Sequence, residues 1–266
     1  MASCLFEVSD IVVRYNQRIA LDHLSMAVQQ GERVALLGAN GSGKSTLLRV
    51  LDGLIFPESG TLVFDGEEVT ESRFEERDFT FQFRRRVGLI FQNPDVQLFN
   101  PTVFDEIAFG PLQLRWPKEE IRRQVEEALE TMDIAALRNR SPHQLSGGEK
   151  KRVALASVMI LDPEVLLLDE PTAALDPKSQ SQIVDLLLSW SGGKKTVITA
   201  THDLDSLEDI SDRCFVFEKG RIVSEGSPFE ILHDVRVLQR ARLVSAHRHS
   251  HHDGQEMPHP HLHLDS

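Results

Sequence analysis

An eight-residue glycine-rich segment, GANGSGKS at 38–45, constrains the fold of this chain more than any other feature. It fits the pattern G-x-x-x-x-G-K-[ST], with an apolar strand-like run at 34–37 before it and a helical pattern to about Gly53 after it. In such a loop the backbone N–H groups turn inward toward phosphate, and the next helix adds its positive dipole end. An ordinary glycine-rich turn is the alternative, but both flanking elements favour a phosphate loop. We expect Lys44 to reach the β- and γ-phosphates and Ser45 to offer its hydroxyl to Mg²⁺.

Short apolar runs alternate with helical patterns along the rest of the chain. Strand-like runs occur at 5–15, 19–28, 61–64, 87–91, 165–168, 196–199 and 214–217. A helix is predicted over 119–132, where the apolar side chains recur on one face, and another opens at Asp176-Pro177 and ends near Trp190. Such alternation predicts an α/β fold with a mostly parallel sheet.

Composition and charge exclude several classes of protein. The chain has 266 residues, of which 41% are hydrophobic and 26% charged, a balance typical of a globular protein with a core. Its net charge of −12 disfavours a general nucleic-acid partner. No apolar run approaches the ~18–20 residues that span a bilayer, and no signal peptide is recognisable. We therefore expect the chain to reach a membrane only through another chain.

Two further strand ends carry candidate catalytic groups. Asp169 and Glu170 follow the apolar run at 165–168, at the carboxyl edge where α/β sheets bind ligands. Asp169 is predicted to hold Mg²⁺, and Glu170 to orient or deprotonate an attacking water. His202 follows the run TVITAT at the same edge and is a candidate partner for the γ-phosphate. Alone, each of these groups is more often structural, and the phosphate loop favours the functional interpretation.

The segment LSGGE at 145–149 predicts a second helix start. Ser146 and Glu149 have the spacing of a capping box, so a helix should run to about Leu161. Two glycines, which lower helix propensity, leave its first N–H groups bare for an anion. A well-capped helix without a ligand is the simpler alternative.

These segments together resemble the ATP-binding subunit of an ABC transporter over about residues 5–235. The order of motifs is that of the family: Walker A at 38–46, a Q-loop at Gln92, the signature at 145–149, Walker B at 166–169 with Glu170, a D-loop at 174–176 and a switch histidine at 202. The resemblance implies a P-loop NTPase fold with an N-terminal antiparallel β-subdomain and a helical subdomain at about 95–160. It places the ABC ATPase domain at 1–244.

The resemblance also assigns residues to ATP and Mg²⁺. Tyr15 matches the aromatic residue that stacks on adenine, and Gln92 joins Glu170 and His202 as a catalytic residue. Mg²⁺ is assigned to Ser45, Gln92 and Asp169. The residues expected to bind the nucleotide are Tyr15, Gly38, Asn40, Gly41, Gly43, Lys44, Ser45, Thr46, Ser146 and Gly148.

In that family, two subunits enclose ATP, with the Walker A loop of one facing the signature of the other. Because both half-sites look intact, the simplest form is an ATP-enclosing homodimer, although a heteromer stays open. The implied partners are a transmembrane coupling subunit and a substrate-binding membrane subunit, and the implied location is the cytoplasmic face of the membrane, as a peripheral subunit.

The segment after Gln92 points to one branch of the family. QNPDVQLF at 92–99 resembles the Q-loop region of energy-coupling-factor and cobalt/nickel transporter ATPases. Thr102 and Asp105 predict a helix cap, and Gly110-Pro111 the end of that short helix. Residues 74–86 are a longer, more charged insertion than expected. Their alternating phenylalanines predict a short strand packed on one face, with a solvated surface insertion as the alternative and no function assigned.

The last residues, 245–266, are rich in histidine and poor in apolar periodicity, which predicts a disordered tail. Neutral imidazole suits Ni²⁺ or Co²⁺, and the candidate ligands are His249, His251, His252, His259, His261 and His263. Tail and Q-loop together favour ATP-driven import of cobalt or nickel. The alternatives are an energy-coupling ATPase for a vitamin, a nucleic-acid-associated ABC ATPase, and a metal-storage or delivery protein.

Overall fold

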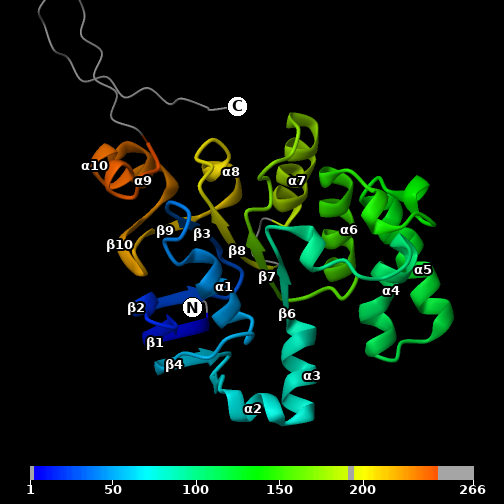
Figure 1. Cartoon of the computed structure of the whole chain (residues 1–266), viewed down its shortest axis with the longest axis horizontal. Helices are drawn as coiled ribbons and strands as arrows, with labels where there is room; N and C mark the ends of the chain where they lie inside the picture. The colour runs from blue at the N-terminus through cyan, green and yellow to red at the C-terminus, as the bar shows by residue number, and fades with distance from the viewer. Residues whose placement is uncertain (1–2, 191–194, 245–266) are drawn as a thin grey trace, which may run out of the picture.

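The computed structural model describes residues 3–190 and 195–244 of the chain. Its strands and helices form two sheets with helices packed around them (Figure 1). The strands are β1 (Cys4–Tyr15), β2 (Arg18–Gln29), β3 (Arg33–Leu37), β4 (Ser59–Phe64), β5 (Glu67–Glu68), β6 (Val87–Ile90), β7 (Val165–Asp169), β8 (Thr196–Thr201), β9 (Arg213–Glu218) and β10 (Arg221–Gly226). The helices are α1 (Lys44–Leu51), α2 (Glu71–Glu75), α3 (Arg77–Arg86), α4 (Val103–Gln113), α5 (Lys118–Thr131), α6 (Gly147–Met159), α7 (Pro177–Ser189), α8 (Leu207–Ile210), α9 (Pro228–His233) and α10 (Val235–Arg240), with 3-10 turns η1 (Pro94–Val96), η2 (Ala135–Leu137) and η3 (Pro142–Gln144).

The main sheet confirms the predicted parallel architecture. Its strand order is β10-β9-β3-β8-β7-β6, and all neighbours run parallel except β10, which pairs antiparallel with β9. The strands β3, β7 and β8 are almost entirely buried, which explains their continuous apolar runs. Their carboxyl ends therefore bring the loops after residues 37, 169 and 201 to one edge of the sheet.

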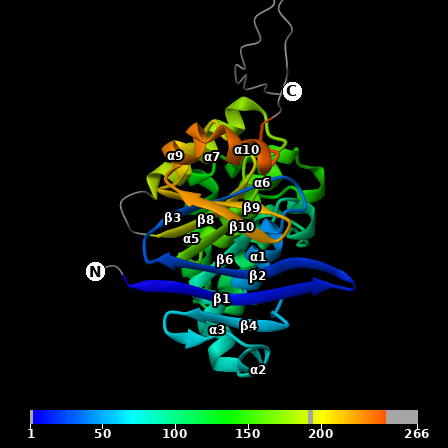
Figure 2. The same ribbon diagram turned by 90° about the vertical axis from the view of Figure 1, so that its left-hand side faces the viewer.

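A second sheet, also predicted, is antiparallel in the order β2-β1-β4-β5. Figure 2 shows β1, β2 and β4 lying across one side of the molecule. The phosphate-loop helix α1 contacts β2 in this sheet and β7 and β8 in the main sheet. Leu47, Leu48 and Leu51 of α1 are fully buried in the core that the two sheets share. Burial on both sides fixes the start of α1 at the mouth of the loop.

The helices α4, α5 and α6 pack on the opposite side of the main sheet around a second core (Figure 1). Ile121, Val125 and Leu129 of α5 are buried in it, as the helical spacing predicted. The boundaries 95–160 for a helical subdomain and 1–244 for the whole domain stay predictions. The histidine-rich stretch 245–266 lies outside the described residues. None of the helices in the described part of the chain is both long and apolar enough to cross a bilayer.

The predicted strand within residues 74–86 is wrong, because this segment forms the end of α2 and the whole of α3. Phe79 and Phe83 are four residues apart, so the alternation that suggests a strand also places them on one helix face. That face packs against the ring of Phe74, with ring centroids 5.5 and 5.1 Å away. Phe81 points away and is 46% exposed.

The predicted helix end at Gly110-Pro111 is also wrong, because α4 continues to Gln113 with Pro111 inside it. A Cβ atom on Gly110 would lie 3.1 Å from the side chain of Leu161, just beyond α6. The glycine thus lets two helices approach closely rather than ending one of them. The predicted cap at Thr102 is confirmed, since its side chain accepts a hydrogen bond from the N–H of Asp105.

Candidate functional site

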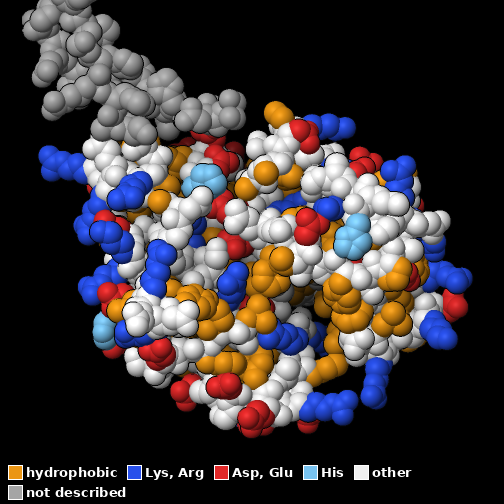
Figure 3. Space-filling view, in the orientation of Figure 1, with side chains coloured by type: hydrophobic (Ala, Val, Ile, Leu, Met, Phe, Trp, Pro, Cys, Tyr) orange, Lys and Arg blue, Asp and Glu red, His pale blue; other side chains and the backbone are white. Residues whose placement is uncertain are grey.

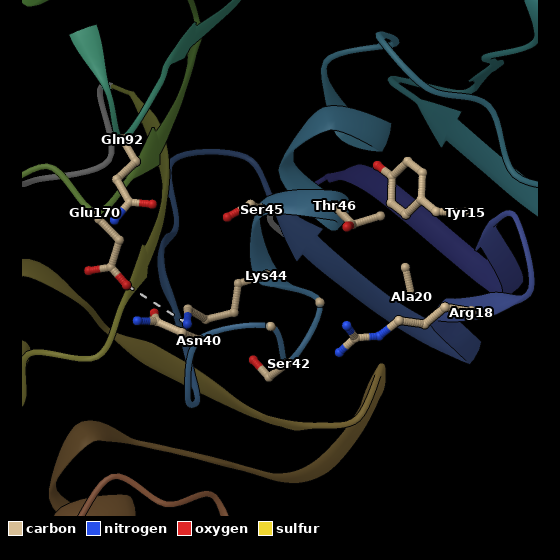
Figure 4. A pocket seen from close by; sticks show the side chains of 12 residues that line it. Tyr15, Arg18, Ala20, Asn40, Ser42, Lys44, Ser45, Thr46, Gln92 and Glu170 are labelled. Atoms are coloured by element: carbon tan, nitrogen blue, oxygen red, sulfur yellow. Dashed lines mark ion pairs between the residues drawn. The ribbon is translucent and has the colours of Figure 1, made fainter.

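A pocket of about 450 Å³ opens beside the phosphate loop, between the carboxyl edge of the main sheet and the antiparallel sheet (Figure 4). It is lined by Tyr15, Arg18, Ala20, Asn40, Gly41, Ser42, Gly43, Lys44, Ser45, Thr46, Gln92 and Glu170. Most of the predicted ATP-site residues are therefore brought together. Of the others, Asp169 contacts the lining residue Ser45, and His202 contacts the lining residue Glu170. Gly38 contacts Lys44 through its carbonyl oxygen, whereas Ser146 and Gly148 lie at the start of α6 and do not line the pocket.

The loop adopts a conformation that glycine makes accessible. Gly43, the residue before α1, has φ +117°, and a Cβ atom there would lie 2.8 Å from the carbonyl oxygen of Ala20. The loop curls around Lys44, whose Nζ donates to the carbonyl oxygens of Gly38 at 2.5 Å and Ala39 at 3.4 Å. Burial lowers the pKa of Lys44, while the charges of Glu170 and Asp169 act in the opposite direction.

One polar atom in the loop is buried without a partner. Ser42 is 7% exposed, and its hydroxyl makes no hydrogen bond with any described residue. A buried hydroxyl without a partner is costly, so its place in the lining of this pocket fits a polar ligand such as phosphate.

Sequence reasoning missed Arg18, Ala20 and Ser42. Arg18 and Ala20 come from β2, and the phosphate-loop motif carries no signal for a strand so distant in sequence.

Ser45 and Asp169 meet beside Lys44. The hydroxyl of Ser45 donates to Oδ1 of Asp169 at 2.9 Å, although the residues come from α1 and the end of β7. Burial raises the pKa of Asp169, the hydrogen bond from Ser45 lowers it, and the charge of Glu170 raises it further. A hydroxyl and a carboxylate, with the amide of Gln92 on the same pocket, form the hard oxygen donor set that Mg²⁺ takes together with phosphate oxygens. The residues present therefore fit that ion.

Glu170 and His202 follow the neighbouring strands β7 and β8 and contact each other. Nδ1 of His202 lies 2.9 Å from Oε1 of Glu170, and the same carboxylate oxygen is 3.8 Å from Nζ of Lys44. The Glu170 side chain is 4% exposed, whereas that of His202 is 53% exposed. A buried carboxylate held between an imidazole and an ammonium can accept a proton from a water in the pocket.

The predicted second anion site begins α6, and its capping box is present. The hydroxyl of Ser146 accepts a hydrogen bond from the N–H of Glu149, whose carboxylate accepts one from the N–H of Ser146. The two glycines differ in surroundings: a Cβ atom on Gly148 would lie 2.9 Å from Oγ of Ser179, whereas Gly147 faces open space. Packing against α7 thus accounts for Gly148, and the helix start stays away from the pocket of its own chain.

The segment after Gln92 carries exposed apolar side chains. Val96 and Phe99 are 66% and 63% exposed, and the ring centroid of Phe99 lies 4.9 Å from that of Phe109 on α4. Figure 3 shows hydrophobic side chains gathered around a hollow between the two halves of the molecule. The segment is attached to α6, because Lys150 pairs with Asp95 at 2.7 Å and Gln97 donates to the carbonyl oxygen of Ala154 at 3.0 Å.

The histidines proposed as ligands for nickel or cobalt, at 249, 251, 252, 259, 261 and 263, lie outside the described residues. Among residues 3–190 and 195–244, no group of three or more His, Cys, Asp or Glu side chains is arranged to hold a metal ion.

Comparison with known proteins gives a consistent result. Residues 21–173 match the family model described as "ABC transporter". The chain is 52% identical over 242 residues to the nickel import ATP-binding protein NikO of Rhodobacter capsulatus, covering 90% of this chain and 95% of that protein. Energy-coupling factor transporter ATP-binding proteins are also among its relatives, so the predicted branch is confirmed.

Solved structures share the fold. The structure of cbiO1 from Clostridium perfringens, part of the ABC transporter complex cbiONQ, superposes with a TM-score of 0.75 at 37% identity, covering 90% of this chain and 95% of that one. A dimeric, post-hydrolysis ATP-binding cassette bound to ADP and phosphate gives a TM-score of 0.75 at 27% identity, covering 84% and 99%. ABC cassettes are thus known as dimers and as parts of larger transporter complexes.

Proposed function

The chain belongs to the ABC transporter ATP-binding proteins, which hydrolyse ATP for transport, and we propose that it powers import of nickel or cobalt through a separate membrane subunit. The observation that carries the choice of cargo is the 52% identity, over 90% of the chain, with a nickel import protein. The Q-loop sequence at 92–99 and the histidines of residues 245–266 support it independently. We keep 1–244 as the ATPase domain, with a helical subdomain at about 95–160.

We assign the chemistry to residues around the pocket. Tyr15, 43% exposed on β1, stacks on the adenine, while the loop residues at 38, 40, 41, 43 and 46 hold the phosphates through their backbone. Lys44 neutralises charge on the β- and γ-phosphates. Glu170 takes the proton of the attacking water, and His202 orients its carboxylate and contacts the γ-phosphate. Gln92 senses the same phosphate from the neighbouring strand end.

Mg²⁺ would be held by Ser45, Asp169 and Gln92, and it would neutralise the charge that develops between the β- and γ-phosphates. The Ser45–Asp169 hydrogen bond keeps both oxygen donors on the same side of the pocket. Buried charges there cost less when they are balanced, and the cation Lys44 stabilises the charged forms of both Asp169 and Glu170.

The second half of each site comes from another copy of the chain. Ser146 and Gly148 lie away from the pocket of their own chain, and the exposed start of α6 has bare N–H groups suited to an anion. We propose that these residues contact the γ-phosphate bound to the opposite subunit. The dimeric cassette of similar fold supports this arrangement. Because each chain carries both halves, the proposal is a homodimer with two ATP sites.

Coupling to the membrane is assigned to the exposed apolar segment after Gln92. Val96 and Phe99 present exposed apolar side chains, which suit contact with a helix of a transmembrane coupling subunit. A substrate-binding membrane subunit would complete the importer, and no nucleic-acid partner is proposed. The chain would then act as a peripheral subunit at the cytoplasmic face of the membrane.

A transport assay tests the proposal and its alternative. The complex would be purified from membranes, reconstituted into liposomes with ATP, and offered radiolabelled Ni²⁺, Co²⁺ or a set of vitamins. Uptake of a metal ion that is lost in the Glu170→Gln variant supports the proposal. Uptake of a vitamin without metal uptake supports the energy-coupling alternative, and co-purifying nucleic acid would contradict both.

A further inference from the structure

A buried lysine on α6, Lys151, contacts the backbone of two residues assigned to the site, Gln92 and Glu170. Lys151 is 2% exposed, and its Nζ donates to three backbone carbonyl oxygens: those of Phe91 at 3.1 Å, Gln92 at 3.0 Å and Glu170 at 3.2 Å. An ammonium group has three N–H donors, so all of them are used. Phe91 and Gln92 follow β6, and Glu170 follows the neighbouring strand β7. One side chain thus joins two strand ends to the helix that starts at Ser146.

The backbone of Glu170 needs this support. Glu170 has φ +48°, a left-handed conformation that is unfavourable for a residue with a side chain. Its N–H donates to the carbonyl oxygen of Ala200 on β8 at 2.9 Å, and its own carbonyl accepts from Lys151. Both polar backbone groups of the residue are therefore hydrogen-bonded, the N–H to Ala200 and the carbonyl to Lys151 and to the N–H of Ala173 at 3.3 Å.

The buried charges around Lys151 also link it to Glu170. Lys44, Lys151, Asp169 and Glu170 are each at most 6% exposed and form a buried group of two cations and two anions. Burial lowers the pKa of Lys151 to about 8, while the carboxylates of Asp169 and Glu170 raise it. The two lysines thus balance the two carboxylates from opposite sides, one from the phosphate loop and one from α6.

We propose that Lys151 is a positioning residue that sets the direction of the Glu170 carboxylate and transmits movement of α6 and the Q-loop to it. The contacts Lys150–Asp95 and Gln97–Ala154 already attach the Q-loop segment to α6. Of these contacts, only the hydrogen bonds of Lys151 extend to Glu170. The inference rests on the proposed role of Glu170 as the base, and it adds the connection from the surface at 96–99 to that base.

The test compares Lys151→Met with Lys195→Met in the full-length chain purified with its membrane partners. Methionine fills the space of the lysine stem but donates no hydrogen bond, so the carbonyls of Phe91 and Gln92 lose this donor and that of Glu170 keeps only the N–H of Ala173 at 3.3 Å. We expect kcat for ATP hydrolysis to fall about tenfold to a hundredfold, the size of effect that misplacement of a catalytic group by about 1 Å produces, with KM and ATP affinity changed less than about threefold. The control removes a lysine whose Nζ contacts Asp162 at 2.6 Å and the carbonyl oxygen of Pro163 at 2.7 Å and not Glu170, and it should leave kcat within about twofold of wild type.

A double-mutant cycle separates positioning from a general packing defect. In the Glu170→Gln background, Lys151→Met should lower the residual single-turnover rate little further, because its effect acts through Glu170. An equal further loss would overturn the inference. So would a normal kcat in Lys151→Met, or a loss of ATP binding in step with kcat.

A substitute variant and a comparison with Glu170→Gln keep the test decisive. If circular dichroism shows that Lys151→Met does not fold, Lys151→Gln takes its place, because its amide has two N–H donors on a side chain one bond shorter and cannot satisfy all three carbonyl oxygens. A reduced kcat with normal ATP binding then supports the inference, and a wild-type kcat overturns it. Wild-type hydrolysis by Glu170→Gln alone overturns the proposed base and the inference together. An inactive Glu170→Gln beside a fully active Lys151 variant overturns the inference only.

Discussion

Nδ1 of His202 lies 2.9 Å from Oε1 of Glu170, so the ends of two neighbouring parallel strands join a half-exposed imidazole to a buried carboxylate. The pair depends on the sheet register, in which Asp169 stands beside Ala200. Glu170 directly follows Asp169, and His202 lies two residues after Ala200. In the proposed mechanism, the carboxylate of Glu170 faces the attacking water and His202 contacts the nucleotide.

Glu170→Gln should therefore stop the chemistry and spare binding. The amide keeps the size of the side chain but cannot take a proton, so ATP hydrolysis should fall by about 10² to 10⁴-fold. ATP affinity, measured with a fluorescent analogue, should stay near wild type, and ATP should trap the dimer. Hydrolysis at the wild-type rate would show that the base is assigned wrongly.

Ser146→Arg should block ATP-driven dimerisation while each monomer still binds nucleotide. The new side chain would cover the start of α6, which meets the phosphate of the opposite subunit in the proposed dimer. Size-exclusion chromatography with ATP in the Glu170→Gln background measures the effect. Ser72→Arg, on the exposed face of α2, adds the same side chain away from α6 and should still dimerise. Loss of monomer binding in Ser146→Arg would mean that the signature acts on its own chain.

Val96→Ser and Phe99→Ser should uncouple transport from hydrolysis. Both side chains are mostly exposed and neither residue lines the pocket, so hydrolysis by the free dimer should stay within about twofold of wild type. Uptake by the assembled complex should fall about tenfold or more, since buried aromatic anchors dominate interfaces. Phe229→Ser removes an equally exposed ring on α9 and serves as the control. Equal loss of activity with and without the partner would place the segment in the catalytic core.

Much of the site could be predicted because its signals are local. The loop at 38–45 and the caps at Ser146 and Asp176 depend on residues within a few positions, and all three are found at the expected helix starts. The misses depend on distant partners. The spacing of Phe79 and Phe83 fits either a strand or a helix until Phe74 is placed, and Gly110 is explained only by Leu161, 51 positions later. The three carbonyl contacts of Lys151 likewise carry no pattern in the sequence.

The burial of Asp52 should make stability fall as pH rises. Asp52 is buried at the end of α1, with Nη1 of Arg84 2.7 Å from its Oδ2. Burial raises the pKa of Asp52 to about 6, although the charge and hydrogen bond of Arg84 lower it. The folded state thus binds this proton more tightly than the unfolded chain, and its contribution is lost between pH ~4 and ~6.

Asp52→Asn removes that titration. Relative to wild type, the free energy of unfolding of this variant should rise by roughly 2–3 kcal/mol from pH 4 to pH 7, measured by denaturant unfolding. Asp212→Asn is the opposite control. Partial burial raises the pKa of Asp212, but hydrogen bonds from Arg33 lower it overall, so that variant should lose relative stability as pH rises. A difference curve for Asp52→Asn that is flat or of opposite sign would contradict the assignment.

Deleting residues 247–266 should separate metal binding from the ATPase. The deletion removes seven of the eleven histidines, at positions 247, 249, 251, 252, 259, 261 and 263, and none of the residues assigned to ATP. Hydrolysis should stay close to wild type, while most binding of Ni²⁺ or Co²⁺ should be lost. In the full chain, binding should also weaken as pH falls through ~6.5, because a protonated imidazole cannot ligate a metal. Isothermal titration of both chains with each ion, above and below that pH, measures both effects. Equal affinity in the two chains would exclude chelation by these histidines and leave the similarity to the nickel import protein and the Q-loop sequence as the grounds for a metal cargo.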